Sequence, residues 1–263
     1  MELYVVDTHA HLDMPEFNTD RAVVIERAAQ TGVKTIVTIG IDLKSSQESV
    51  ELAQGYPGVF AAVGIHPHEA EGATSDDIAQ LEVLAKKPKV VALGEMGLDY
   101  YRNHSSREAQ LKVFNWQLEL SLKIALPIII HCRQALPDVL EILGKWSVAS
   151  QLTSPKGIIH CFSGDLATVR AYIDMGFCLA LGGYIGYPSS LSFKEVLRDV
   201  PLDRLVLETD CPFLPPQQYR GKRNEPAYIL QTLRFLADLK GLPVEEVAHR
   251  TTANALAVFR IAA

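Results

Sequence analysis

The chain has 263 residues, of which 48% are hydrophobic and 21% are charged, and its formal net charge is −6. This composition is typical of a globular protein, and the negative charge excludes a broad basic surface that coats nucleic acid by charge alone. No apolar run reaches the roughly 18 to 20 residues that a membrane span needs. The four cysteines form no CxxC pair, which favours a reducing, cytoplasmic setting.

Short apolar segments recur along the chain, and helical patterns lie between them. We predict strands at residues 3–11, 32–40, 58–68, 89–99, 126–132, 156–164, 176–183 and 203–212. We predict helices at residues 20–31, 45–54, 75–86, 106–125, 137–144, 166–175, 193–200, 225–240 and 244–260. Because the strand segments are continuously apolar rather than alternating, they indicate strands that are buried on both faces of a parallel sheet.

The alternation of eight strands with helices predicts the α/β class. It favours a (β/α)8 barrel, with a doubly wound open sheet as the competing architecture. We find no internal repeat or linker and expect residues 1–263 to form a single domain. The longest irregular stretch, residues 209–226, follows the last predicted strand. In a barrel, such a loop lies over the active-site face.

Histidines and carboxylates gather at the predicted strand ends, namely at His9, His11, His66, His131, His160, Glu95, Glu208 and Asp210. The carboxyl ends of all strands of a parallel barrel meet at one mouth, so we expect these side chains to converge there. Imidazole and carboxylate ligands suit Zn²⁺, Mn²⁺ or a similar divalent ion. Their number suggests two metal ions that share Glu95, with Asp210 orienting or deprotonating the attacking water.

Other polar residues have both a functional and a structural interpretation. We expect Asp7 and Glu208 to support the ligand histidines, His68 to cap the helix that follows it, and His104 and His249 to lie at the surface. The candidate substrate contacts are His66, Asp99, Arg102, Arg133, Arg223 and Asn224. For Asp99 and Arg102 the alternative is an ion pair within a loop, and for the segment RGKRNEP it is a solvated basic loop.

Seven segments together resemble the TatD-type metal-dependent deoxyribonucleases, a branch of the amidohydrolase-like barrel hydrolases. They are DTHAHLD, GIHPH, GEMGLDYYR, PIIIHCR, HCFSG, ETDCPFL and RGKRNEP, in order from residue 7 to residue 226. Relatives in the wider superfamily often carry a carboxylated lysine where this chain has Glu95, which favours the TatD branch. Gln134 and Phe213 stand where many TatD relatives have an acidic residue and a tyrosine.

The resemblance implies a ligand set and an activity. His9, His11 and Asp210 would bind one divalent ion, His131 and His160 the second, and Glu95 would bridge them; the ions are Mg²⁺, Mn²⁺, Zn²⁺ or Ni²⁺. The implied activity is cleavage of phosphodiester bonds in DNA, as a 3′–5′ exonuclease, by a metal-activated water in which Glu95 and Asp210 act as the catalytic residues.

Two other functions stay open from the sequence. One is a metal-dependent ester or amide hydrolase, such as a D-aminoacyl-tRNA deacylase, and the other is a non-catalytic metal-binding barrel. As the substrate partner we expect DNA with short or single-stranded ends. We expect no membrane association, no obligate protein partner and a monomer.

Overall fold

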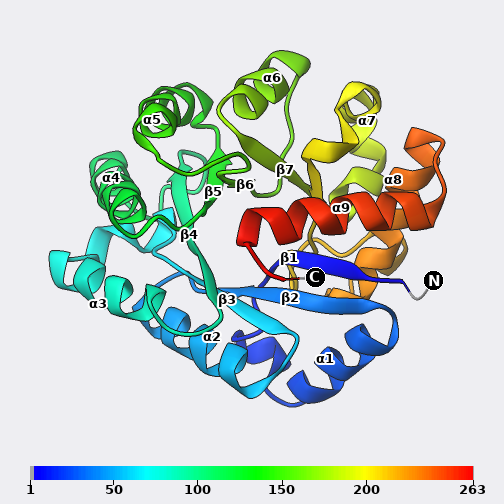
Figure 1. Cartoon of the computed structure of the whole chain (residues 1–263), viewed down its shortest axis with the longest axis horizontal. Coiled ribbons are helices and arrows are strands. Elements are labelled where there is room, and N and C mark those ends of the chain that lie inside the picture. Colours follow the sequence, from blue (N-terminus) through cyan, green and yellow to red (C-terminus); the bar gives the residue numbers. More distant parts are fainter. Residues whose placement is uncertain (1–2, 263) are drawn as a thin grey trace.

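The computed structural model describes residues 3–262 and contains an eight-stranded parallel sheet in the order β1 to β8. The strands are β1 (Val5–Ala10), β2 (Val33–Ile39), β3 (Val59–Val63), β4 (Val90–Asp99), β5 (Ile128–Arg133), β6 (Gly157–Ile159), β7 (Phe177–Leu181) and β8 (Leu205–Leu207). The sheet closes where Ala10 bridges Cys211 and the His11 N–H donates to the Cys211 carbonyl at 2.8 Å. The predicted barrel is therefore confirmed (Figure 1).

Nine helices accompany the strands in the described residues, and most of them form the ring around the barrel in Figure 1. They are α1 (Arg21–Gln30), α2 (Leu43–Gly55), α3 (Ser75–Ala85), α4 (Arg107–Ile124), α5 (Leu136–Ala149), α6 (Leu166–Asp174), α7 (Leu191–Asp199), α8 (Ile229–Lys240) and α9 (Val244–Phe259). Most helix ends lie within one or two residues of the predicted ends, because capping residues that can be recognised in the sequence mark them. Thr74 begins α3 with a capping box, and Gly241 ends α8 at a left-handed φ of 64°.

The predicted start of α8 is wrong by four residues. We expected the helix to begin at Glu225, but the structure forms a 3-10 turn over Pro226–Tyr228, and α8 begins at Ile229. The carboxylate of Glu225 forms two hydrogen bonds to the Arg27 guanidinium, at 2.8 and 3.0 Å. This contact with a distant helix holds residue 225 in an extended conformation, with φ −151° and ψ 158°.

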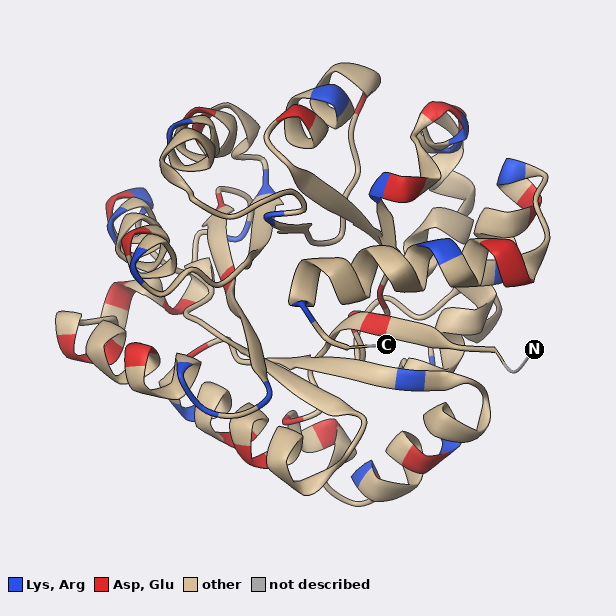
Figure 2. Ribbon diagram, viewed as in Figure 1, with Lys and Arg blue, Asp and Glu red and all other residues tan. Residues whose placement is uncertain are grey.

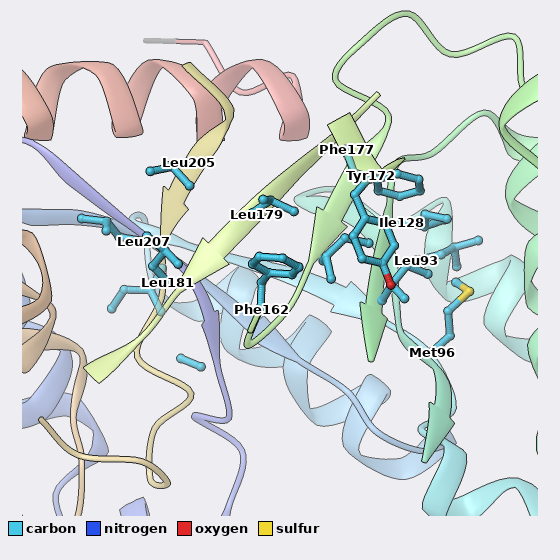
Figure 3. Packing of buried hydrophobic residues seen from close by; sticks show 14 of the residues in the cluster. Leu93, Met96, Ile128, Phe162, Tyr172, Phe177, Leu179, Leu181, Leu205 and Leu207 are labelled. Carbon is cyan, nitrogen blue, oxygen red and sulfur yellow. The ribbon is translucent and has the colours of Figure 1, made fainter. Parts of the chain in front are cut away.

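Each strand buries both of its faces, which explains the continuous apolar segments. In β7, Phe177, Leu179 and Leu181 pack in the layer between strands and helices, whereas Cys178 and Ala180 pack inside the barrel. Figure 3 shows the outer set beside Leu205 and Leu207 of β8. The alternation of the side chains along a strand therefore supplies two separate hydrophobic layers.

Helix α9 closes the amino-terminal end of the barrel. Leu256 and Phe259 are buried against the interior cluster, and the Asn254 side chain donates to the Leu205 carbonyl at the start of β8, at 2.7 Å. The hydroxyl of Thr252 donates to the Tyr4 carbonyl just before β1 at 2.8 Å. Figure 1 shows α9 lying across the strands. Only the carboxyl ends of the strands are therefore left to form an open site.

Charged residues lie mostly on the outer helices and loops (Figure 2). The exceptions include Asp7, Glu95 and Asp99, which are buried within β1 and β4. Buried carboxylates are costly unless they are paired or bind a cation, so these positions mark the functional region. None of the helices described over residues 3–262 is long and apolar enough to span a membrane.

Candidate metal centre

Strand β1 delivers two histidines to the mouth. His9 and His11 are 1% and 4% exposed, and their Nε2 atoms lie 3.3 Å apart. The Nδ1 atom of His11 lies 3.1 Å from the carbonyl of Ile39 in β2. Because a carbonyl can only accept, Nδ1 carries the proton and the Nε2 lone pair points into the site.

Glu95 of β4 lies between two groups of histidines. We call them the His11 group, which consists of His9 and His11, and the His131 group, which consists of His66, His131 and His160. Its Oε2 atom lies 3.3 Å from His9 Nε2. Its Oε1 atom lies 2.7 Å from His131 Nδ1, 3.6 Å from His66 Nε2 and 3.8 Å from His160 Nε2. Burial alone would raise the pKa of Glu95, but the surrounding imidazoles lower it well below its usual value, so Glu95 is an anion between the two groups.

The close approach of β4 and β5 depends on a glycine. Gly97 has a φ of +147°, and a Cβ atom there would lie 1.9 Å from the carbonyl oxygen of His131. The two residues are also partners in the register of β4 and β5. Glycine at this position therefore allows His131 to reach Glu95.

His160 follows β6 and stacks on His9, with the ring centroids 3.6 Å apart. Its Nδ1 atom lies 2.9 Å from Glu208 Oε2, and Glu208 Oε1 accepts from the Cys161 N–H at 2.8 Å. Burial would lower the pKa of His160, but the charges of Glu208, Glu95 and Asp210 raise it to about 10. The same negative potential attracts a cation.

Asp210 reaches the site from the segment after β8. Its backbone has a left-handed φ of 57°, and its N–H donates to the His9 carbonyl at 2.8 Å. Its Oδ1 atom lies 3.4 Å from His11 Nε2, 3.8 Å from His160 Nε2 and 3.9 Å from His9 Nε2. The carboxylate therefore faces the histidines of β1 and β6.

These side chains fit a divalent metal. Within residues 3–262, three sets offer ligand atoms that all lie within 4.8 Å of one another: His9, His160 and Glu208; His9, His11 and Glu95; and His66, Glu95 and His131. The ion pairs described for Glu95 and Asp210 are all with histidines. A protonated His160 offsets only part of the charge of the two buried carboxylates, whereas a divalent cation neutralises both and lets the imidazoles bind as neutral ligands.

Asp7 supports the backbone around the site. Its carboxylate accepts from the Thr209 hydroxyl at 2.6 Å, from the Thr209 N–H at 2.9 Å and from the His9 N–H at 3.3 Å. Burial raises the pKa of Asp7 to about 7. The sequence analysis did not single out Thr209. Its position between Glu208 and Asp210 was the one feature that could have drawn attention to its hydroxyl.

Asp99, a candidate substrate contact, lies against a candidate ligand. Its Oδ2 atom lies 3.1 Å from His131 Nε2 and 3.0 Å from His68 Nε2. The expected cap also differs, because the His66 Nδ1 atom accepts from the His68 N–H at 3.1 Å. His66 thus both caps the 3-10 helix Pro67–Gly72 and faces Glu95, while His68 contacts Asp99.

The expected arginine contacts fall into two places. Arg133 and Arg102 are exposed, and their guanidinium carbons lie 4.1 and 5.8 Å from the ring centroid of Tyr101. In contrast, Arg223 forms a two-pronged ion pair with Asp20 at 2.8 and 2.7 Å. The first two arginines are therefore available beside β4 and β5, whereas Arg223 is already paired.

Asn224 is fully buried and holds the segment that carries Asp210. Its side-chain amide donates to the Thr209 carbonyl at 2.8 Å and to the Phe213 carbonyl at 2.7 Å. The structure therefore gives Asn224 a structural contact on both sides of a candidate ligand. His104 and His249 are exposed, as predicted.

Comparison with known proteins identifies the family. The family model described as "TatD related DNase" matches residues 6–260. The chain belongs to the TatD family. The resemblance seen in the seven sequence segments is thereby confirmed, as is the assignment to metal-dependent hydrolases.

TatD relatives match over almost the whole chain. The chain is 42% identical over 255 residues to "Uncharacterized metal-dependent hydrolase YabD" of Bacillus subtilis, covering 97% of this chain and 98% of that protein. It is 34% identical over 263 residues to "3'-5' ssDNA/RNA exonuclease TatD" of Erwinia billingiae, covering 98% and 99%. The crystal structure of the TatD homologue YJJV from Escherichia coli matches with a TM-score of 0.92 and 30% identity over 100% of both chains.

Proposed function

We propose that this TatD protein is a nuclease that removes nucleotides from the 3′ end of single-stranded DNA with two divalent metal ions. The observation that carries the proposal is Glu95, which offers one carboxylate oxygen to His9 and the other to His131. A carboxylate shared in this way is typical of two-metal hydrolases. The relative from Erwinia billingiae, named as an ssDNA/RNA exonuclease, supports the choice of substrate.

The candidate ligands divide into two groups around Glu95. His9, His11 and Asp210 would hold one ion, and His131 and His160 the other, with His66 close to the second group. Bound divalent ions supply polarisation of the phosphoryl oxygens and lower the pKa of water. Histidine nitrogen and carboxylate oxygen suit Zn²⁺, Mn²⁺ and Ni²⁺, and Mg²⁺ where carboxylates dominate.

The protein side chains position the reactants and move the proton. Asp210 accepts a proton from the attacking water as the new bond to phosphorus forms. The bond from phosphorus to the leaving oxygen breaks, and the proton passes from Asp210 to that oxygen. Arg133, exposed next to His131 and Cys132 at the end of β5, offers a positive charge to the phosphate.

The remaining features of the proposal concern the whole protein. We propose that the chain acts as a single domain and as a monomer without an obligate protein partner. The four cysteines are free thiols, which supports a reducing cytoplasmic location.

The test is an assay of the purified protein with Mg²⁺, Mn²⁺ or Zn²⁺. The substrates are single-stranded DNA and RNA carrying a 5′ label, together with an aminoacyl-tRNA ester. We expect stepwise shortening from the 3′ end, and at least about a hundredfold loss of kcat in Asp210→Asn and Glu95→Gln. Circular dichroism serves as the folding control. Ester turnover without cleavage of either nucleic acid would contradict the nuclease proposal.

A further inference from the structure

Two exposed aromatic side chains flank the candidate metal centre. Among residues 3–262, the exposed large hydrophobic residues include two aromatic ones, Tyr101 at 51% and Phe213 at 45%. Scattered exposed hydrophobic residues are ordinary on protein surfaces. These two are distinguished by position, because each adjoins residues of a different histidine group.

Tyr101 is fixed relative to the His131 group. Its N–H donates to Asp99 Oδ1 at 2.9 Å, while the other oxygen of the same carboxylate lies 3.1 Å from His131 Nε2. Arg133 is the register partner of Asp99, and its guanidinium carbon lies 4.1 Å from the centroid of the tyrosine ring. One buried carboxylate therefore positions both an aromatic ring and a candidate ligand, with a cation stacked on the ring.

Phe213 is fixed relative to the His11 group. Its N–H donates to the Asp210 carbonyl at 2.8 Å, and its own carbonyl accepts from the Asn224 amide at 2.7 Å. The ring lies edge-on to His11, with the centroids 6.0 Å apart and the planes at 67°. The backbone on both sides of this exposed ring is therefore held by hydrogen bonds, and the ring stands beside the candidate ligands.

We propose that Tyr101, whose ring is backed by Arg133, and Phe213 are specificity-determining residues that stack on unpaired bases at either side of the scissile phosphate. The inference rests on the proposed nuclease function. Aromatic rings and guanidinium planes stack on any base, so they provide affinity without sequence preference. A base inside a duplex is already stacked on its neighbours, so this pair of platforms selects unpaired strand ends.

The test measures stacking directly, in addition to turnover. A single-stranded oligonucleotide carries 2-aminopurine near its 3′ end and phosphorothioate linkages that slow its cleavage. We expect binding to the metal-loaded wild type to quench the fluorescence. Tyr101→Ala and Phe213→Ala should each weaken binding by about tenfold and reduce the quenching. Tyr101→Phe and Phe213→Tyr keep the rings and should restore both.

Cleavage provides the second measurement. The wild-type protein should cleave a normal oligonucleotide with a higher kcat/KM than one with abasic sites around the scissile phosphate. In each alanine variant the ratio of these two kcat/KM values should be smaller, mainly because KM for the normal oligonucleotide rises. Val148→Ala, at an 88% exposed position of α5, is the control and should leave the ratio unchanged.

The outcomes separate the two proposals. Cleavage with the wild-type ratio and wild-type quenching in both alanine variants would overturn the stacking role and leave the nuclease function intact. A wild-type protein that cleaves no oligonucleotide with any of the metals would contradict the nuclease function itself, and the stacking role with it.

Discussion

Glu208 shows how a single residue orients a candidate ligand. Its two oxygens bind different partners, the His160 ring and the Cys161 N–H, and it is fully buried. The first contact places a proton on His160 Nδ1 and leaves Nε2 facing Glu95 and Asp210. The identity of residue 208 thus decides whether the imidazole presents a lone pair to a metal.

We predict that Glu208→Ala lowers the affinity for the divalent metal by about 10- to 100-fold, because the His160 ring loses the partner that fixes its tautomer. Competition with a metal-sensitive dye measures this change. Glu208→Gln keeps an acceptor for the ring N–H and should bind metal with intermediate affinity. Equal affinities of the alanine variant and the wild type would show that His160 needs no such support.

At the scale of elements, the two ends of the barrel have separate tasks. Helix α9 packs into the amino-terminal end through Leu256 and Phe259, whereas the candidate ligands lie at or beyond the carboxyl ends of β1, β4, β5, β6 and β8. Packing at the first end therefore stabilises the barrel without touching the second. This division is common in (β/α)8 enzymes.

We predict that Phe259→Ala lowers the free energy of unfolding by about 3 to 5 kcal/mol, because it leaves a cavity beneath the barrel. The kcat of the folded variant should stay within about twofold of wild type, because the centre is formed at the opposite end. Urea unfolding and steady-state assays measure the two quantities. Val148→Ala is the surface control, with an expected change below about 0.5 kcal/mol. If kcat of the folded variant fell along with the free energy of unfolding, packing at the amino-terminal end would affect the geometry of the centre at the carboxyl end.

At the scale of the whole molecule, bound metal should stabilise the folded chain, since the candidate ligands converge only after folding. We predict that a chelator lowers stability by about 2.7 kcal/mol when the metal had been present at a hundred times its Kd. This change corresponds to a fall in Tm of roughly 5 to 10 °C for a chain of this size. Differential scanning calorimetry with and without chelator measures the shift.

The control for this prediction is Asp210→Asn, which keeps the shape of the side chain but removes its charge. Its Tm should respond less to chelator than the wild-type Tm. An identical Tm for chelated and metal-loaded wild type would argue that no metal binds the folded state.

The sequence was sufficient to predict the barrel and the convergence of the histidines. Strands buried on both faces have a recognisable pattern, and parallel topology brings His9 and His160 to one mouth. It was not sufficient for side chains whose partners lie on other loops. Arg223 looked like a phosphate contact, but Asp20, 203 positions away, pairs with it. Thr209 is another example, since its hydroxyl bonds to Asp7 only because β1 and β8 become neighbours.

The hydrogen bonds from Thr209 to Asp7 join residues 202 positions apart, and they have a consequence for biosynthesis. Ribosomes add about 5 to 20 residues per second. Asp210 is therefore synthesised on the order of ten to forty seconds after His9 and His11. During that interval the growing chain has exposed histidines but no complete centre. We therefore expect the chain to bind metal only after the barrel closes. The catalytic activity of newly made protein then measures the fraction of chains that have finished folding.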